Sequence, residues 1–232
     1  MTAVEGPQAI GRGKLTGYTL ALNYLPVAQI GLGAALVASQ ATSPRSAFVW
    51  IAVWIFLLPP LVCRLTLWLF GIPQGRGLTQ ADRAYKVWWF VHQWQILFNR
   101  LPWLEELLRL VPGLYALWIL LWGGRVSPLV YWAPGSLLID RSLVVVEPGA
   151  VIGVGAGIAG HAGTLAPDGS YRIDIAAPRV GRGAMMGARS GLGPGAELAP
   201  GTMLPAGRLV PQFTLWDGVA KRRLAAIGNP DD

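Results

Sequence analysis

A six-residue repeat runs through the second half of the chain. From Val146 to Gly163 the sequence reads VEPGAV, IGVGAG and IAGHAG, and from Val180 to Leu209 it reads VGRGAM, MGARSG, LGPGAE, LAPGTM and LPAGRL. Each hexad opens with an aliphatic residue, and its fifth place is Ala, Ser or Thr except in the last, where it is Arg208. This period is typical of a parallel β-helix, in which three hexads form one triangular coil, large side chains fill the interior and small residues permit tight corners.

The same stretch also contains the spacing of a dinucleotide-binding loop, Gly155-x-Gly157-x-x-Gly160. That motif needs a helix immediately after the glycines, so that the helix N-terminus faces the pyrophosphate. Here Gly163 and Pro167 follow within a few residues and would break such a helix. We therefore interpret these glycines as coil corners.

The hexad pattern resembles that of the bacterial hexapeptide-repeat acyltransferases, which fold as left-handed β-helices. The resemblance covers roughly residues 125–212. It implies transfer of an acyl group from a thioester such as acyl-CoA to a hydroxyl or amine, and it implies a homotrimer. In this family a histidine just ahead of a loop excursion serves as the general base, which assigns that role to His161.

His161 occupies the fourth place of its hexad, directly before the interrupting segment TLAPDGSYRIDIAAPR. The Pro-Asp-Gly turn between two short alternating runs predicts a hairpin that leaves the coil. Histidine suits a general base because its ordinary pKa of about 6.5 lets it accept a proton near neutral pH. Such a base needs an acceptor on its other ring nitrogen. The candidates are Asp140, Glu147, Asp168 and Asp174, and we select Asp140, about one coil before His161.

The resemblance also implies where coenzyme A would bind. Matching hexad to hexad places Ala188 and Ala206 along the pantetheine arm, and Arg208 is a candidate phosphate ligand. The family often has a Thr-Lys pair after its last coil, where this chain has Pro211 and Gln212. The Lys-Arg-Arg run at 221–223 is either a substitute phosphate site or a solvated tail.

No metal is expected. A β-helical hydrase of the carbonic anhydrase type binds zinc through three histidines, whereas this region offers only His161. The other histidine, His92, lies in a tryptophan-rich segment, and we interpret it as structural or interfacial. The single cysteine, Cys63, excludes an internal disulfide and a cysteine-based zinc site.

The first half of the chain is predicted to be membrane-bound. Residues 18–39 carry no charge, and residues 47–70 form a second apolar run that contains Pro59 and Pro60. Both runs are long enough to span a hydrocarbon core of about 30 Å. A re-entrant hairpin at the prolines is the alternative for the second run. Basic residues flank the pair of runs, so the positive-inside rule predicts that both termini are cytoplasmic, at a bacterial inner membrane.

Nine of the eleven tryptophans precede residue 123, and many of them fall between residues 79 and 124. Tryptophan suits the membrane–water interface, so short helices here would lie on the bilayer. The alternative is a helical collar packed on the β-helix, and the two are compatible. The net charge of +7 fits an anionic lipid surface, and no nucleic-acid-binding motif is visible.

Together these features predict an α+β chain with transmembrane and interfacial helices followed by a short left-handed parallel β-helix. The expected regions are a membrane anchor (1–78), tryptophan-rich helices (79–124), the acyltransferase domain (125–212) and a tail (213–232). The predicted function is a membrane-anchored acyltransferase with His161 as the general base, acting on a lipid-linked or amphiphilic acceptor. The alternative is a degenerate β-helix that serves as a structural or assembly subunit at the membrane.

Overall fold

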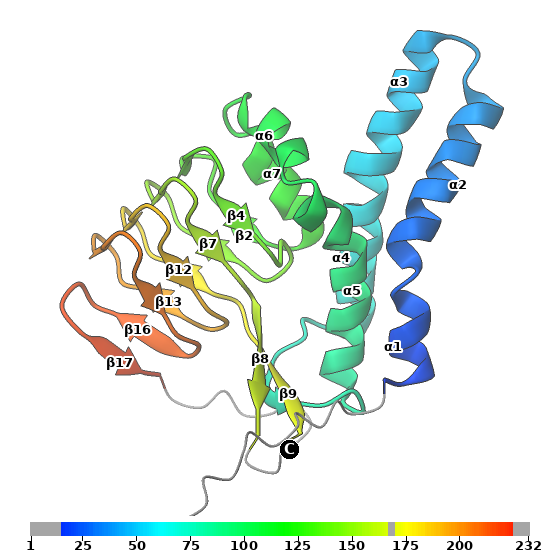
Figure 1. Cartoon of the computed structure of the whole chain (residues 1–232). Coiled ribbons are helices and arrows are strands. Elements are labelled where there is room, and N and C mark those ends of the chain that lie inside the picture. The colour runs from blue at the N-terminus through cyan, green and yellow to red at the C-terminus, as the bar shows by residue number, and fades with distance from the viewer. Residues whose placement is uncertain (1–14, 167–169, 225–232) are drawn as a thin grey trace, which may run out of the picture.

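The computed structural model describes residues 15–166 and 170–224. It consists of apolar N-terminal helices followed by a parallel β-solenoid of about four turns (Figure 1). The solenoid lies on one side, a long helical hairpin stands on the other, and three further helices lie between them. The predicted order of fold elements is therefore confirmed.

Two long apolar helical segments form the hairpin. The first comprises α1 (Gly17–Leu22) and α2 (Leu25–Gln40), and the second comprises α3 (Pro44–Ala52), η1 (Val53–Leu57) and α4 (Leu58–Phe70). Both are long and apolar enough to cross a membrane, with mean hydropathies of 1.6 and 2.2. Only 11% and 17% of these windows are buried inside the protein, so most of their apolar side chains face outward.

The second helical segment continues through its paired prolines. Pro59 and Pro60 stand in the first turn of α4, and the π-helical turn η1 directly precedes them. A proline removes a backbone donor and its ring crowds the carbonyl of the preceding turn, and a wider π turn accommodates that defect without ending the helix. The continuous helix from Pro44 to Phe70 favours a span over a re-entrant hairpin.

The tryptophan-rich region forms a collar of three helices between the hairpin and the solenoid. These are α5 (Arg83–Arg100), α6 (Trp103–Arg109) and α7 (Leu114–Trp122). Trp88, Trp118 and Trp122 are at most 4% exposed, and α7 runs directly into the first coil, which it contacts. The burial of these three side chains therefore fits the alternative of a helical collar packed on the β-helix, whereas Trp103 remains exposed.

Three parallel sheets form the faces of the solenoid. Their strands are only two or three residues long, as follows. The first sheet contains β2 (Arg125–Val126), β5 (Val145–Val146), β10 (Arg179–Val180), β13 (Glu197–Leu198) and β16 (Thr214–Trp216); the second contains β3 (Tyr131–Trp132), β6 (Val151–Ile152), β11 (Met185–Met186) and β14 (Met203–Leu204); the third contains β4 (Leu137–Leu138), β7 (Gly157–Ile158), β12 (Gly191–Leu192) and β15 (Leu209–Val210).

The predicted hexad register is confirmed by burial. The residue that opens each hexad points inward and is at most 2% exposed: Val146, Ile152, Ile158, Val180, Met186, Leu192, Leu198 and Leu204. The solenoid is longer than the eight hexads, which account for less than three coils. A first coil precedes them, and β16 extends the first sheet past residue 212, where β17 (Lys221–Arg223) pairs with it antiparallel.

The segment that interrupts the hexads is a hairpin, as predicted. Strand β8 (His161–Leu165) pairs antiparallel with β9 (Tyr171–Ile175), and the Pro-Asp-Gly turn at 167–169 lies outside the described residues. On its other edge β9 pairs with β1 (Gly75–Leu78), the strand between the long helical hairpin and α5. In Figure 1 the β8–β9 hairpin extends downward from the solenoid toward the lower ends of α1 and α5.

Candidate active site

The centre of the candidate site is the carboxylate of Asp140, which is fully buried at the corner after β4. Its Oδ2 accepts a hydrogen bond from the backbone N–H of Gly160 at 2.8 Å and lies 2.7 Å from Nδ1 of His161. These residues meet because one coil of the solenoid stacks directly on the next: Leu137 and Leu138 pair with Gly157 and Ile158. Asp140 and His161 then follow at the same corner.

The other carboxylate oxygen faces the collar. Oδ1 accepts a hydrogen bond from Trp88 Nε1 at 3.1 Å and lies 3.4 Å from Nδ1 of His92. Trp88 and His92 are four residues apart on α5, and helical geometry places such residues on one face. The rings of the two histidines are 4.9 Å apart. A second histidine therefore shares the carboxylate, although the sequence analysis interpreted His92 as structural or interfacial.

The surroundings of Asp140 keep it ionised. Burial alone would raise the pKa of its carboxyl, but the charge and hydrogen bond of His161, followed by those of His92, outweigh burial and lower that pKa well below its usual range. An ionised carboxylate only accepts hydrogen bonds, so Nδ1 of His161 must donate. The neutral tautomer compatible with this contact has its proton on Nδ1 and leaves the lone pair that a general base needs on Nε2.

His161 and His92 line a cavity of about 710 Å³. The His161 side chain is 22% exposed, so the cavity gives it a route to solvent and to a ligand. The lining residues come from α1, β1, α5 and the β8–β9 hairpin: Leu15, Thr19, Asn23, Leu78, Thr79, Gln80, Ala81, Tyr85, Trp88, Trp89, His92, His161, Ser170, Tyr171, Arg172 and Ile173. The cavity therefore lies where the helical hairpin, the collar and the solenoid meet.

The other candidate acids have different partners. Glu147 pairs with Arg179 and accepts the N–H of Arg182 on the surface. Asp174 accepts the N–H of Gly77 at 2.8 Å and so links the hairpin to β1. Asp168 lies outside the described residues. Of the described candidates, only Asp140 contacts His161.

The predicted coenzyme A residues lie at a different corner. Ala188 and Ala206 are exposed and belong to successive coils, because Ala188 accepts the N–H of Gly207, the residue after Ala206. Ala188 and Ala206 lie before the first residues of β12 and β15, whereas His161 lies after the last residues of β7. The two groups are therefore at opposite ends of the parallel strands of this sheet. Arg208 is exposed, and its guanidinium lies 5.2 Å from the ring centre of Trp216. Their contact with coenzyme A stays a prediction.

His92, Asp140 and His161 also form a set that could hold a metal ion, since one ligand atom from each lies within 4.8 Å of the others. Bonds of about 2.1 Å at tetrahedral angles would hold zinc ligand atoms about 3.4 Å apart. Nδ1 of His161 and Oδ2 of Asp140 are 2.7 Å apart, the length of a direct hydrogen bond. The geometry therefore favours a hydrogen-bonded pair over shared coordination by these two atoms.

Comparison with known proteins yields structural neighbours only. No family model and no curated protein matches this chain. The neighbours are serine acetyltransferases. The enzyme from Neisseria gonorrhoeae is 14% identical, with 95% of this chain and 96% of that chain covered and a TM-score of 0.24. The enzyme from Brucella abortus strain S19 is 16% identical, with 91% and 96% covered and a TM-score of 0.24. Isoform 3 from Entamoeba histolytica, solved with cysteine, is 9% identical, with 94% and 98% covered and a TM-score of 0.23.

TM-scores of this size carry no inference about activity. The β-solenoid is established by its own strand pairing, and chemistry has to be inferred from the side chains around Asp140. The sequence analysis missed Trp88 and His92 as members of the site. Their spacing of four residues on a helix was visible, but their approach to Asp140 depends on how α5 docks against the first coil.

Proposed function

We propose that this chain is a membrane-anchored acyltransferase that moves an acyl group from a thioester such as acyl-CoA to a hydroxyl or amine. The observation that carries the proposal is the pairing of His161 with the buried, ionised Asp140 at the wall of a large cavity. An orienting carboxylate on one imidazole nitrogen and an available second nitrogen together make a general base.

The reaction follows from this geometry. Nε2 of His161 takes the proton of the acceptor hydroxyl or amine as the acceptor oxygen or nitrogen bonds to the thioester carbonyl carbon. The tetrahedral adduct then collapses, the carbon–sulfur bond breaks, and the departing thiolate takes the proton back from the imidazolium. Asp140 stabilises the imidazolium between these steps and remains ionised throughout. The products are the acylated acceptor and free thiol, and the enzyme returns to its initial state.

The place of the cavity supports an acceptor that resides at the membrane. Thr19 lies in α1 and Asn23 directly follows it, so both belong to the first apolar segment. Both line the same cavity as His161. A lipid-linked or amphiphilic molecule held in the bilayer would reach the base from this side. We place both termini and the solenoid in the cytoplasm, at a bacterial inner membrane, where coenzyme A is available. Arg45, in the first turn of α3, is the only cation near the connection between the two spans, and this low number of cations agrees with the positive-inside rule.

The test is release of free thiol from acetyl-CoA by the purified full-length protein, supplied with a lipid extract as the source of acceptor. Release should fall by about 10²–10⁴ in His161→Ala, the usual contribution of a general base. The control is Glu147→Ala, which alters a residue that pairs with Arg179 on the surface and does not line the cavity. Equal thiol release by the wild type and by a folded His161→Ala variant would reject the proposed acyltransferase activity. The alternative of a structural or assembly subunit would then remain.

A further inference from the structure

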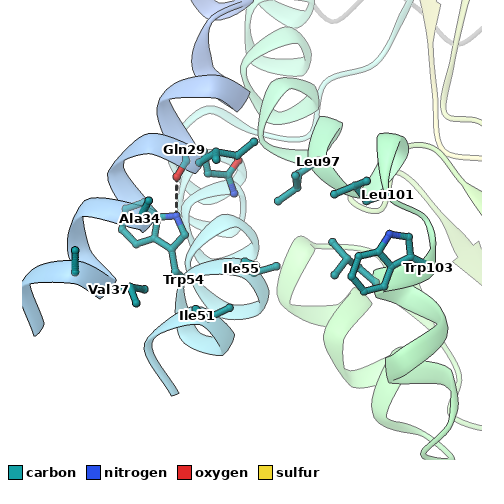
Figure 2. A pocket seen from close by; sticks show the side chains of 13 residues that line it. Gln29, Ala34, Val37, Ile51, Trp54, Ile55, Leu97, Leu101 and Trp103 are labelled. Carbon is teal, nitrogen blue, oxygen red and sulfur yellow. Dashed lines mark hydrogen bonds between the residues drawn. The ribbon is translucent and has the colours of Figure 1, made fainter. Parts of the chain in front are cut away.

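A second cavity, of about 600 Å³, lies within the helical part of the molecule (Figure 2). It is bounded by α2 on one side, by α3 and η1 on the second, and by the end of α5 and the start of α6 on the third. Its lining is almost entirely apolar: Gln29, Ile30, Gly33, Ala34, Val37, Ala38, Ile51, Trp54, Ile55, Leu97, Leu101, Trp103 and Leu104. A cavity of this kind suits a hydrocarbon chain and offers nothing to a charged ligand.

The two cavities lie along the same two helical segments and have no lining residue in common. The first membrane segment lines the catalytic cavity with Thr19 and Asn23 and the apolar cavity from Gln29 onward. Helix α5 lines the catalytic cavity up to His92 and the apolar cavity from Leu97 onward. At a helical rise of about 1.5 Å per residue, the apolar cavity begins only about 8 Å along α5 from His92.

The one polar side chain at the near end of the apolar cavity is Gln29. It is 2% exposed, and neither amide atom has a hydrogen-bond partner among the described residues. Figure 2 shows this side chain extending from α2 into the space toward Leu97, while the indole nitrogen of Trp54 donates to the Gln29 backbone carbonyl. A buried amide without partners is costly, and a polar group on a ligand would satisfy it.

We infer that one amphiphilic acceptor occupies both cavities, with its hydroxyl or amine beside His161 and its single hydrocarbon chain in the apolar cavity. The inference rests on the proposed function, since it names the substrate class of the same site. Gln29 hydrogen-bonds a polar linkage between the head and the chain. The chain enters from the bilayer, where exposed Ile30 and Trp103 border the cavity.

The cavity acts by positioning the acceptor. A chain that is already in the bilayer gains little from contact with apolar side chains, because lipid tails are equally apolar. The benefit is a fixed distance between the chain and the reacting head, which holds the nucleophile near the base. Removing the chain should therefore reduce turnover as well as apparent affinity.

The test uses photolabelling of the full-length protein in vesicles of phosphatidylcholine and phosphatidylglycerol. The probe is a long-chain monoalkylglycerol with a photoreactive diazirine near the end of its chain, and labelled peptides are identified by mass spectrometry. Ala34→Phe fills the apolar cavity, whereas Ala35→Phe adds the same ring one residue further along α2 at an exposed position outside it. Ala38→Phe is a second filling variant.

Label is expected on the peptides that contain Ala34 and Leu101, with a decrease of at least about tenfold in both filling variants and no change in Ala35→Phe or His161→Ala. Equal labelling of Ala34→Phe and Ala35→Phe would overturn the inference and leave the proposed function standing. Displacement of the probe by palmitoyl-CoA but not by unlabelled alkylglycerol would assign the cavity to the acyl donor and would overturn it as well. Thiol release that persists in His161→Ala would instead reject the proposed function.

Discussion

Substituting Asp140 with Asn isolates the role of the carboxylate, because the two side chains have the same shape. Oδ2 of Asp140 accepts hydrogen bonds from the N–H of Gly160 and from Nδ1 of His161. Oδ1 accepts a hydrogen bond from the indole N–H of Trp88. An amide has one oxygen that accepts and one nitrogen that only donates. Whichever way it is placed, its NH₂ group faces a donor.

The magnitude follows from that conflict. Each buried donor left without an acceptor costs about 1–3 kcal/mol, so Asp140→Asn should lower the free energy of unfolding by that amount. If the NH₂ group faces His161, the proton moves to Nε2 and the general base is lost, with an expected decrease in kcat of about 10²–10⁴. Combining Asp140→Asn with His161→Ala should reduce kcat little further, because the two residues act as a unit.

The pH dependence of stability provides a second readout. The pKa of Asp140 is lower in the folded chain than its ordinary value of about 3.9. Its ionised form therefore stabilises the fold at pH values above that ordinary value, and this contribution is lost as the pH falls through the folded pKa. Asparagine does not titrate, so the stability difference between wild type and variant should shrink in acid.

Thiol release and thermal unfolding in detergent measure both effects. Asp174→Asn is the control, because Asp174 is also a buried aspartate that accepts a backbone N–H, from Gly77, yet no hydrogen bond joins it to either histidine in the described structure. Asp174→Asn should weaken the attachment of the β8–β9 hairpin to β1. Its turnover should remain far higher than that of Asp140→Asn. Turnover of Asp140→Asn at the wild-type level, or a stability difference that grows in acid, would refute the assignment of Asp140.

Three further predictions follow from the same structure. Gly160→Ala should lower turnover without unfolding the solenoid, because the added Cβ would lie 2.8 Å from Leu143 Cβ and 3.0 Å from Asp140 Cβ; wild-type turnover with an unchanged circular dichroism spectrum would contradict this. Elemental analysis of the purified protein should find far less than one zinc per chain and activity that survives chelation, and stoichiometric zinc would overturn the hydrogen-bonded pair. The homotrimer that the family resemblance implies stays a prediction, and we expect its contact at Met185, which pairs with Met203 on an exposed apolar face. Met185→Glu should then reduce the mass measured by light scattering to that of one chain; an unchanged oligomer would exclude this face.

The solenoid could be predicted because its interior imposes a strict period on the sequence. Every sixth residue from Val180 to Val210 is fully or almost fully buried, and only a bulky apolar side chain fits there. The first coil lies within the predicted domain of residues 125–212, but its hexads were not recognised, although Val126, Trp132 and Leu138 keep the same spacing. The hexad from Trp132, WAPGSL, keeps the glycine and the small fifth residue of the later hexads, but the hexads from Val126 and Leu138, VSPLVY and LIDRSL, lack the glycine. The first coil also packs against α7.

The site was only partly accessible from the sequence. His161 is marked by its place before the hairpin, and Asp140 follows from coil stacking. His92 joins them through a contact between residues 48 positions apart, which no local pattern encodes. The tryptophans were ambiguous for a different reason, since an indole ring suits a membrane interface and a protein core equally well.

Strand β1 has a mechanical consequence. It follows the second apolar helical segment and is hydrogen-bonded to β9, which is bonded in turn to β8, the strand that begins at His161. In the membrane-anchored arrangement that we propose, these backbone hydrogen bonds would hold His161 at a fixed height above the bilayer. Lengthening the linker at Gly71–Gln74 would change that height, and removing the helical hairpin would remove one wall of the cavity that contains His161.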